Sequence, residues 1–189
     1  MRASASHEVV FDDVCVPHDY AVDIRCPSDW PTPDAQQAAW FTLTIAALYD
    51  GVARAARDWL VTYLTQRTPA NLGAPLASLP RFQEAVGEID GKLLTNQLLL
   101  RSATERVDRG EAPPPHESGL VKLTVTNNAI EAVGSAIALI GNPGLSRHNP
   151  LERHYRDVLC SRIHTPQNDS IVLAAGRAAF AAVQRKELG

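Results

Sequence analysis

The feature that most constrains the fold is a long stretch without proline, from Asp34 to Thr68. Inside it, apolar side chains recur at spacings of three, four or seven residues, which is the repeat of one face of an α-helix. Thr32, Pro33 and Asp34 supply a helix start: a capping hydroxyl, a proline that fits the first turn, and an acid near the N-terminus of the helix. The stretch predicts one very long helix over residues 34–66. Its apolar stripe consists of Phe41, Ile45, Leu48, Val52, Trp59 and Tyr63.

Four more helices are predicted from the same repeat, over residues 79–109, 117–140, 150–163 and 167–187. Loops that contain proline and glycine separate these segments, and Gly141 stands where glycine commonly ends a helix. Long helices joined by loops of about ten residues are typical of an antiparallel bundle, in which neighbouring helices cross at about 20°. The expected fold class is therefore all-α.

One short segment follows a different pattern. Residues 8–16 are rich in β-branched and aromatic side chains and end at Pro17, which predicts a single β-strand. A weaker strand candidate lies at residues 20–24. Three prolines within residues 25–33 predict a linker between this segment and the bundle.

Composition argues against several classes of partner and site. The chain has 189 residues, a net charge of −3 and 18 basic residues that form no cluster, so nucleic acid and anionic membrane surfaces are not expected partners. Three cysteines without paired spacing argue against a disulfide framework and for a reducing compartment. The first residues lack the apolar core of a signal peptide, and no uncharged apolar run approaches the roughly 18 residues of a membrane span. We therefore expect a cytoplasmic protein.

The common catalytic and metal-binding motifs are missing from the sequence. No glycine-rich loop carries the Lys and Ser or Thr of a phosphate-binding loop, and no Gly-x-Ser-x-Gly elbow occurs. His148 and His154 are six residues apart, which does not place them on one helix face, so no metal site is expected. The residues alone therefore leave open a catalytically silent helical protein that only oligomerises.

Several motifs, taken in order, resemble the C-terminal part of the acyl-CoA dehydrogenase superfamily. They are Phe11-Asp12-Asp13-Val14-Cys15-Val16-Pro17, the helical segment from Gly51 to Arg67, Leu79-Pro80-Arg81-Phe82-Gln83, and the glycine turn with its following helix from Gly141 to Asp157. The resemblance implies that residues 1–31 are the end of a middle β-domain with its linker, and that residues 32–189 are the C-terminal helical bundle. It also implies that an N-terminal helical domain and most of the β-domain lie outside this chain, and that the complete protein binds FAD as a dimer or tetramer.

The same resemblance implies a set of flavin contacts. Arg67, at the end of the first long helix, occupies the place of the arginine that binds the flavin pyrophosphate, and Thr68 can add a hydroxyl. Gly141 keeps the glycine turn that lets the backbone approach the flavin, with Asn142 beside it. The glutamine that often precedes this turn in the family is replaced here by Ala138.

The catalytic base is the point at which this sequence departs from the family. Its dehydrogenases remove the acyl α-proton with a glutamate, and the two positions that can carry this glutamate hold Thr165 and Phe41 here. The segment Ile163-His164-Thr165-Pro166 instead resembles a loop of the flavin-dependent monooxygenase branch, in which a histidine faces the flavin. His164 is therefore the candidate catalytic residue, as a hydrogen-bond donor or proton shuttle.

Two flavin-dependent reactions remain open from the resemblance. The first is FAD-dependent oxidation of acyl-CoA by a family member without the usual glutamate, with an electron acceptor as partner. The second is monooxygenation of a small organic substrate by reduced flavin, with a flavin reductase as partner and His164 as the catalytic group. In both cases a homo-oligomer is expected, and Trp40, Trp59 and Leu60 are the residues expected at the subunit interface.

Overall fold

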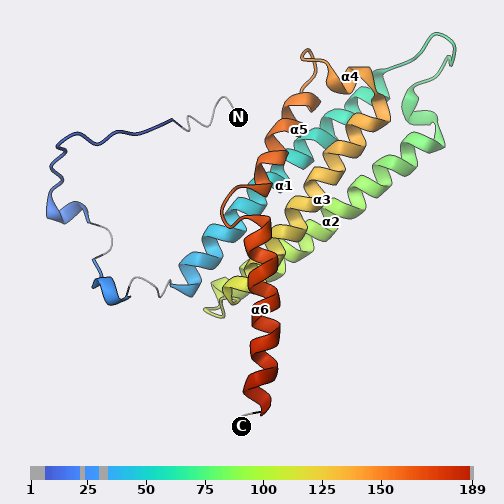
Figure 1. Ribbon diagram of the computed structural model, residues 1–189. Helices are drawn as coiled ribbons and strands as arrows, with labels where there is room; N and C mark the ends of the chain where they lie inside the picture. The colour runs from blue at the N-terminus through green and yellow to red at the C-terminus, as the bar shows by residue number, and fades with distance from the viewer. Residues whose placement is uncertain (1–6, 22–23, 30–33, 188–189) are drawn as a thin grey trace. The chain divides into compact units, whose positions relative to one another are not determined.

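A computed structural model describes residues 7–21, 24–29 and 34–187 of the chain (Figure 1). The α-helices are α1 (Ala35–Gln66), α2 (Pro80–Asp108), α3 (Pro115–Ile140), α4 (Asn142–Leu145), α5 (Leu151–Leu159) and α6 (Asn168–Glu187). Single turns of 3-10 helix are η2 (His18–Tyr20), η3 (Pro27–Asp29), η4 (Leu76–Ser78) and η5 (Cys160–Arg162). All five helices expected from the sequence are present, and α4 is an additional short helix after Gly141. The all-α fold class is confirmed.

The β-strand expected over residues 8–16 is not formed, and apolar side chains of this segment are exposed, with Phe11 at 80%. A strand forms only against a neighbouring strand. The described residues of the first compact unit, Met1–Asp34, contain no second strand that could pair with it. The weaker candidate at residues 20–24 lies partly outside the described residues. The assignment of residues 1–31 to a middle β-domain stays a prediction.

The second compact unit, Ala35–Gly189, is built around α1, α2 and α3, which lie side by side (Figure 1). Consecutive helices run antiparallel, so α1 and α3 point in the same direction. α3 is the central helix, because it packs against α1, α2, α5 and α6. By length and composition alone α3 could cross a membrane, and a helix in the core of a bundle has the same composition.

The buried face of α1 is not the stripe of large apolar residues expected from the sequence. Phe41 and Leu48 of that stripe are each 55% exposed, whereas Ile45 between them is buried. The face that packs into the bundle is rich in alanine, and small side chains let neighbouring helices approach closely. Its buried members are Ala39, Leu43, Ala46, Tyr49, Ala53, Ala56, Leu60 and Leu64.

The burial of this face also limits which residues are available for a subunit interface. Leu60, expected at that interface, is 0% exposed and belongs to the core of the bundle. Trp59 is partly buried and stacks on the Tyr63 ring, with 5.1 Å between ring centroids. Of the three expected interface residues, only Trp40 is an exposed residue, at 38%.

A buried polar network joins the three long helices. Asn96 of α2 donates a hydrogen bond to Asp50 Oδ1 of α1 at 2.9 Å and another to the carbonyl of Val125 in α3 at 3.1 Å. It accepts a hydrogen bond from Asn128 Nδ2 at 2.9 Å. Arg54 donates to the other carboxylate oxygen of Asp50 at 2.6 Å. Because a buried polar group is costly unless it is paired, this network favours one register of the three helices.

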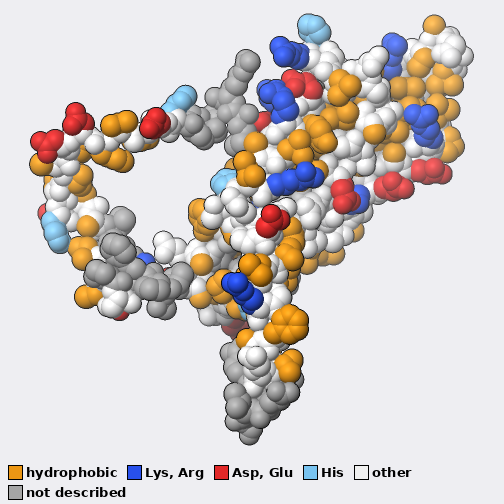
Figure 2. All heavy atoms as spheres, viewed as in Figure 1, with side chains coloured by type: hydrophobic (Ala, Val, Ile, Leu, Met, Phe, Trp, Pro, Cys, Tyr) orange, Lys and Arg blue, Asp and Glu red, His pale blue; other side chains and the backbone are white. Residues whose placement is uncertain are grey.

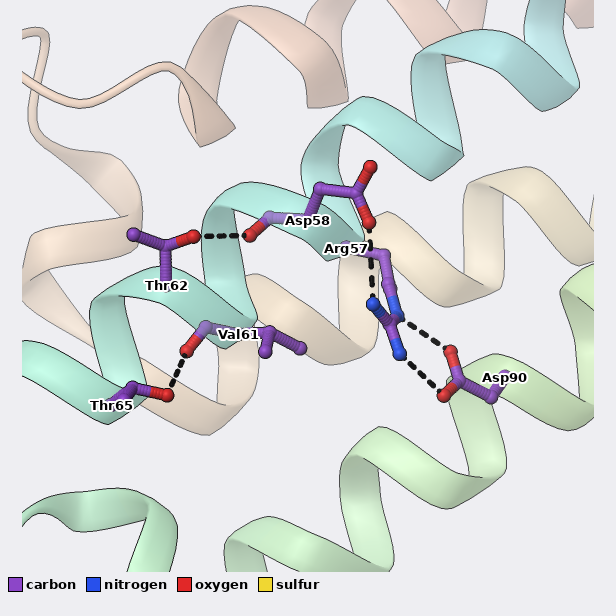
Figure 3. A network of polar contacts seen from close by, with 6 residues as sticks. All are labelled: Arg57, Asp58, Val61, Thr62, Thr65 and Asp90. Atoms are coloured by element: carbon purple, nitrogen blue, oxygen red, sulfur yellow. Dashed lines mark hydrogen bonds and ion pairs between the residues drawn. The ribbon is translucent and has the colours of Figure 1, made fainter.

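A second polar contact between α1 and α2 lies nearer the surface (Figure 3). The Arg57 guanidinium donates two parallel hydrogen bonds to the Asp90 carboxylate, each 2.7 Å long, which is the strong bidentate arrangement. A longer hydrogen bond of 3.3 Å joins Arg57 Nη1 to Asp58. The hydrogen bonds from Arg57 hold the pKa of the Asp90 carboxyl below its usual range.

Replacing Asp90 by asparagine is expected to lower the free energy of unfolding at pH 7 by at most about 1 kcal/mol, because both partners are partly exposed. The folded-state pKa is depressed, so this stabilisation is complete above the unfolded-state pKa near 4 and is lost as the pH falls through the folded-state value. Urea unfolding at pH 7 and at pH 2–4 measures it. Asp58→Asn is the control and should change the free energy of unfolding less. If the difference in unfolding free energy between Asp90→Asn and the unchanged chain grew as the pH fell, the stabilising role of the Arg57–Asp90 pair would be contradicted.

Candidate functional site

His164 lies in the turn between η5 and α6, and its ring contacts the middle of α1. Its Nδ1 atom is 3.1 Å from the hydroxyl oxygen of Tyr49, and the two rings meet edge to face with 5.9 Å between centroids. Tyr49 is 1% exposed, whereas His164 is an exposed residue. Burial raises the pKa of the Tyr49 hydroxyl, and the nearby Cys160 and Asp157 raise it further. The tyrosine therefore stays protonated across the physiological pH range.

This contact engages Nδ1 of His164 and leaves Nε2 to a ligand. A protonated tyrosine hydroxyl can donate to an unprotonated Nδ1, and the proton of a neutral imidazole then lies on Nε2. Nε2 does not take part in the contact with Tyr49. In that tautomer, Nε2 of the exposed His164 can donate a hydrogen bond or pass a proton to a ligand.

A cavity of about 350 Å³ adjoins the same turn and is lined by the first part of α1, the start of α3 and the start of α6. Phe41 and Thr165, the two positions at which the resemblance implies a glutamate, both line it. Among the described residues that line it there is no Asp or Glu, and His116 is the one titratable side chain. The full lining is Ala38, Phe41, Thr42, Pro115, His116, Thr165, Pro166, Ser170, Ile171 and Ala174.

Arg67 and Thr68 follow the last residue of α1 and are both exposed. The backbone of Arg67 is tied down, since its N–H donates to Tyr63 at 2.9 Å and its carbonyl accepts from Leu76 at 2.9 Å. No described residue pairs with the Arg67 guanidinium. A guanidinium that is free of protein partners beside a hydroxyl is suited to bind a phosphate group.

Gly141 and Asn142 lie at the corresponding end of α3. Gly141 has φ +66°, a left-handed conformation that favours glycine, and its N–H caps α3 by donating to Ile137 at 2.9 Å. Asn142 begins α4, and both residues are exposed. Because α1 and α3 run in the same direction, this turn and Arg67 lie at the same end of the bundle (Figure 1).

The structure does not bring His164 to that end. Tyr49, which contacts His164, precedes Arg67 by 18 positions in the sequence. At 1.5 Å per helical residue, Tyr49 and the residue that follows the end of α1 are about 27 Å apart. The four expected flavin contacts therefore form one group, and His164 with the cavity forms another.

Two residues near His164 were not expected from the sequence as site residues. Tyr49 lies on an apolar helix face, where an aromatic residue is typical of the core. Lys122 is 0% exposed on the inner side of α3, and its ammonium contacts the turn that carries His164. The one available signal was that Lys122 is the single Lys or Arg of this helix. In the described part of the chain, no group of three or more His, Cys, Asp or Glu side chains is placed to hold a metal ion.

The family model and a sequence relative of this chain agree on one family. Residues 36–171 match the family model for the acyl-CoA dehydrogenase C-terminal domain. YdbM of Bacillus subtilis, assigned to the acyl-CoA dehydrogenases, is 32% identical over 183 residues, which are 95% of this chain and 46% of YdbM. The amino sugar nitrososynthase DnmZ of Streptomyces peucetius is 30% identical over 181 residues, which are 89% of this chain and 42% of DnmZ. The chain thus spans less than half the length of these relatives.

Solved structures share the same fold. Butyryl-CoA dehydrogenase from Megasphaera elsdenii superposes with a TM-score of 0.70 at 22% identity, over 77% of this chain and 38% of that enzyme. At this level of identity the likeness concerns the arrangement of helices.

Proposed function

Because the chain belongs to the acyl-CoA dehydrogenase family, as its C-terminal helical domain, we propose that it is the C-terminal portion of an FAD-dependent oxidoreductase. Members of the family are FAD-dependent flavoproteins. The donors at one end of the bundle fit this cofactor: Arg67 and Thr68 would hold its diphosphate, and the exposed turn at Gly141 and Asn142 would lie against it. The bound flavin supplies two-electron redox chemistry.

Within this family we propose a monooxygenase that acts on a small organic substrate. The observation that carries the proposal is the cavity at Phe41 and Thr165, which has no carboxylate among its described lining residues. Removal of an α-proton beside a thioester needs a base within hydrogen-bonding distance. The described lining residues of the cavity include no glutamate that could act as this base. DnmZ supports the same branch, since conversion of an amino group to a nitroso group adds oxygen to nitrogen.

The proposed reaction places one atom of O₂ in the substrate and releases the other as water. The two electrons would come from reduced flavin, so a flavin reductase is the expected partner, and two protons are consumed. His164 would hold one of these protons on Nε2 and deliver it to the reacting oxygen, while Tyr49 keeps the ring oriented through Nδ1. Because His164 lies about 27 Å from the Arg67 group along α1, one flavin would meet the two groups on different subunits of the proposed oligomer. The cavity binds the apolar part of the substrate and excludes water from it.

We also propose that the protein assembles as a dimer or tetramer. Beyond its first turns, α6 extends away from the other helices, and hydrophobic side chains are visible on it in Figure 2. Large contiguous patches of exposed apolar side chains are unusual on a monomer. The exposed apolar side chains of α6 are Val172, Leu173, Phe180 and Val183, at 54–76%.

Two assays of the complete enzyme distinguish the monooxygenase from a dehydrogenase. In the first, chemically reduced FAD and ¹⁸O₂ are supplied with a panel of small apolar amines and phenols, and mass spectrometry detects ¹⁸O in the product. In the second, acyl-CoA substrates of several chain lengths are supplied with an artificial electron acceptor. We expect label incorporation and no rapid dye reduction. Rapid acyl-CoA-dependent dye reduction would refute the monooxygenase proposal.

Arg67→Ala is expected to weaken FAD binding by the complete enzyme about 10–100-fold, since a hydrogen bond to a charged group contributes about 1.5–3 kcal/mol. Arg67→Lys keeps the charge without the bidentate geometry, so its FAD affinity should lie between that of the unchanged enzyme and that of Arg67→Ala. Quenching of flavin fluorescence during titration measures the affinity. Arg101→Ala is the matched control, because Arg101 is exposed on α2 and pairs with Glu105. Equal effects of the Arg67 and Arg101 replacements would show that Arg67 is no flavin ligand.

A further inference from the structure

Lys122 is the most unusual charged group of the bundle, because its side chain is completely buried at the centre of the fold. Lysine is almost never fully buried unless its ammonium is paired. Lys92 of α2 shows the ordinary arrangement, a half-buried side chain paired with Glu131. Among the described residues no carboxylate pairs with Lys122.

Main-chain carbonyls take the place of that carboxylate. Lys122 Nζ donates to the carbonyl oxygens of Ser161 at 2.7 Å, His164 at 3.0 Å and Pro166 at 2.8 Å. An ammonium has three N–H donors, so these three contacts satisfy it. The side-chain oxygen of Asn168 lies further away, at 3.5 Å. Burial lowers the pKa of the Lys122 ammonium, and the three carbonyl dipoles are its nearest compensation.

All three carbonyls belong to one turn, the connection between α5 and α6 that carries His164. Ser161 lies in the single turn η5, and the residues between η5 and α6 form no regular secondary structure, so the carbonyls of His164 and Pro166 lack the partners that a helix would supply. Lys122 therefore determines the path of the main chain on both sides of His164. Tyr49 holds the other end of the same residue, at its ring.

We propose that Lys122 is the positioning residue of His164: it fixes the main chain of the turn so that the imidazole meets Tyr49 and presents Nε2 outward. α3 thus holds the backbone of His164, and α1 holds its ring. The catalytic consequence rests on the proposed function of His164, whereas the geometric part does not depend on it. A merely structural Lys122 would stabilise the bundle without affecting the contact between the two rings.

The geometric part is tested by NMR on this chain. Lys122→Met has a similar length and no charge or donors; we expect a folded protein by circular dichroism that has lost the nuclear Overhauser contact between the Tyr49 and His164 rings. Lys92→Met is the matched control and should retain it. Persistence of the contact in folded Lys122→Met would overturn the proposal.

A second variant covers the case in which Lys122→Met does not fold. Lys122→Cys, in a chain with Cys15, Cys26 and Cys160 replaced by serine, is alkylated in urea and refolded. Aminoethylation restores an ammonium on a chain of nearly the same length, and should restore the ring contact. Carbamidomethylation supplies no charge and should not. A folded aminoethyl protein without the contact, or a folded carbamidomethyl protein with it, would contradict the proposal.

The catalytic consequence is measured separately on the complete enzyme. Lys122→Met and Tyr49→Phe should lower oxygenation, and the double variant should lose little beyond the larger single effect, because both act through His164. Loss of the ring contact with full activity would leave the positioning role intact and remove His164 from catalysis. Multiplicative losses in the double variant would overturn the claim that Lys122 acts through His164.

Discussion

Replacing His164 by alanine is expected to lower oxygenation by the complete enzyme about 10²–10⁴-fold, the usual loss when a positioned proton donor is removed. Flavin affinity should stay within about twofold, because the proposed flavin contacts lie about 27 Å away along α1. The two quantities are measured on one preparation, as ¹⁸O incorporation and as quenching of flavin fluorescence. A loss of turnover without a loss of affinity is the signature of a group that acts on the reacting atoms.

His148→Ala is the control for this experiment, since His148 is an exposed histidine in the turn before α5. Tyr49→Phe should lower oxygenation by about 2–10-fold, which is more than His148→Ala and less than His164→Ala. It removes one hydrogen bond of about 0.5–1.5 kcal/mol and leaves the imidazole in place. His116→Ala tests the alternative proton donor, since His116 lines the cavity itself. A larger loss from His116→Ala than from His164→Ala would move the proton donor to α3.

Replacing Leu60 by alanine is expected to lower the free energy of unfolding by about 2–5 kcal/mol, the range for a buried leucine that leaves a cavity. Leu60 is 0% exposed, in the core between α1 and its neighbours. Leu48 provides a matched control on the same helix, because it is 55% exposed and its replacement should change stability by no more than about 0.5 kcal/mol. Urea unfolding monitored by circular dichroism measures both.

The same pair of variants tests which face of α1 is available to another subunit. Leu60→Ala should destabilise the fold and leave the oligomeric state unchanged in light scattering below the unfolding transition. If Leu60→Ala instead released monomers with an unaltered unfolding free energy per subunit, Leu60 would belong to an interface, as the sequence pattern first indicated.

The existence and approximate ends of the helices could be predicted from the sequence because these signals are local. Helical period, the prolines at the starts of α2 and α3 and the glycine at position 141 act within a few turns, and α1, α2 and α3 begin and end within about two residues of the expected positions. The helix start expected at Thr32 and Pro33 lies outside the described residues. The family resemblance rests on the same ordered motifs. The expected strand at residues 8–16 failed because a strand depends on a partner that the described residues of its segment do not provide.

The buried faces and the site were decided by tertiary structure. A helical repeat shows that stripes exist, but the neighbouring helices select the stripe they bury; here they select the alanine-rich face over the one with Phe41 and Leu48. Tyr49 and His164 are 115 positions apart in the chain, so only packing brings them together. Lys122 is a site residue for the same reason: its role depends on carbonyls that reach it once α5 and α6 have packed on α3.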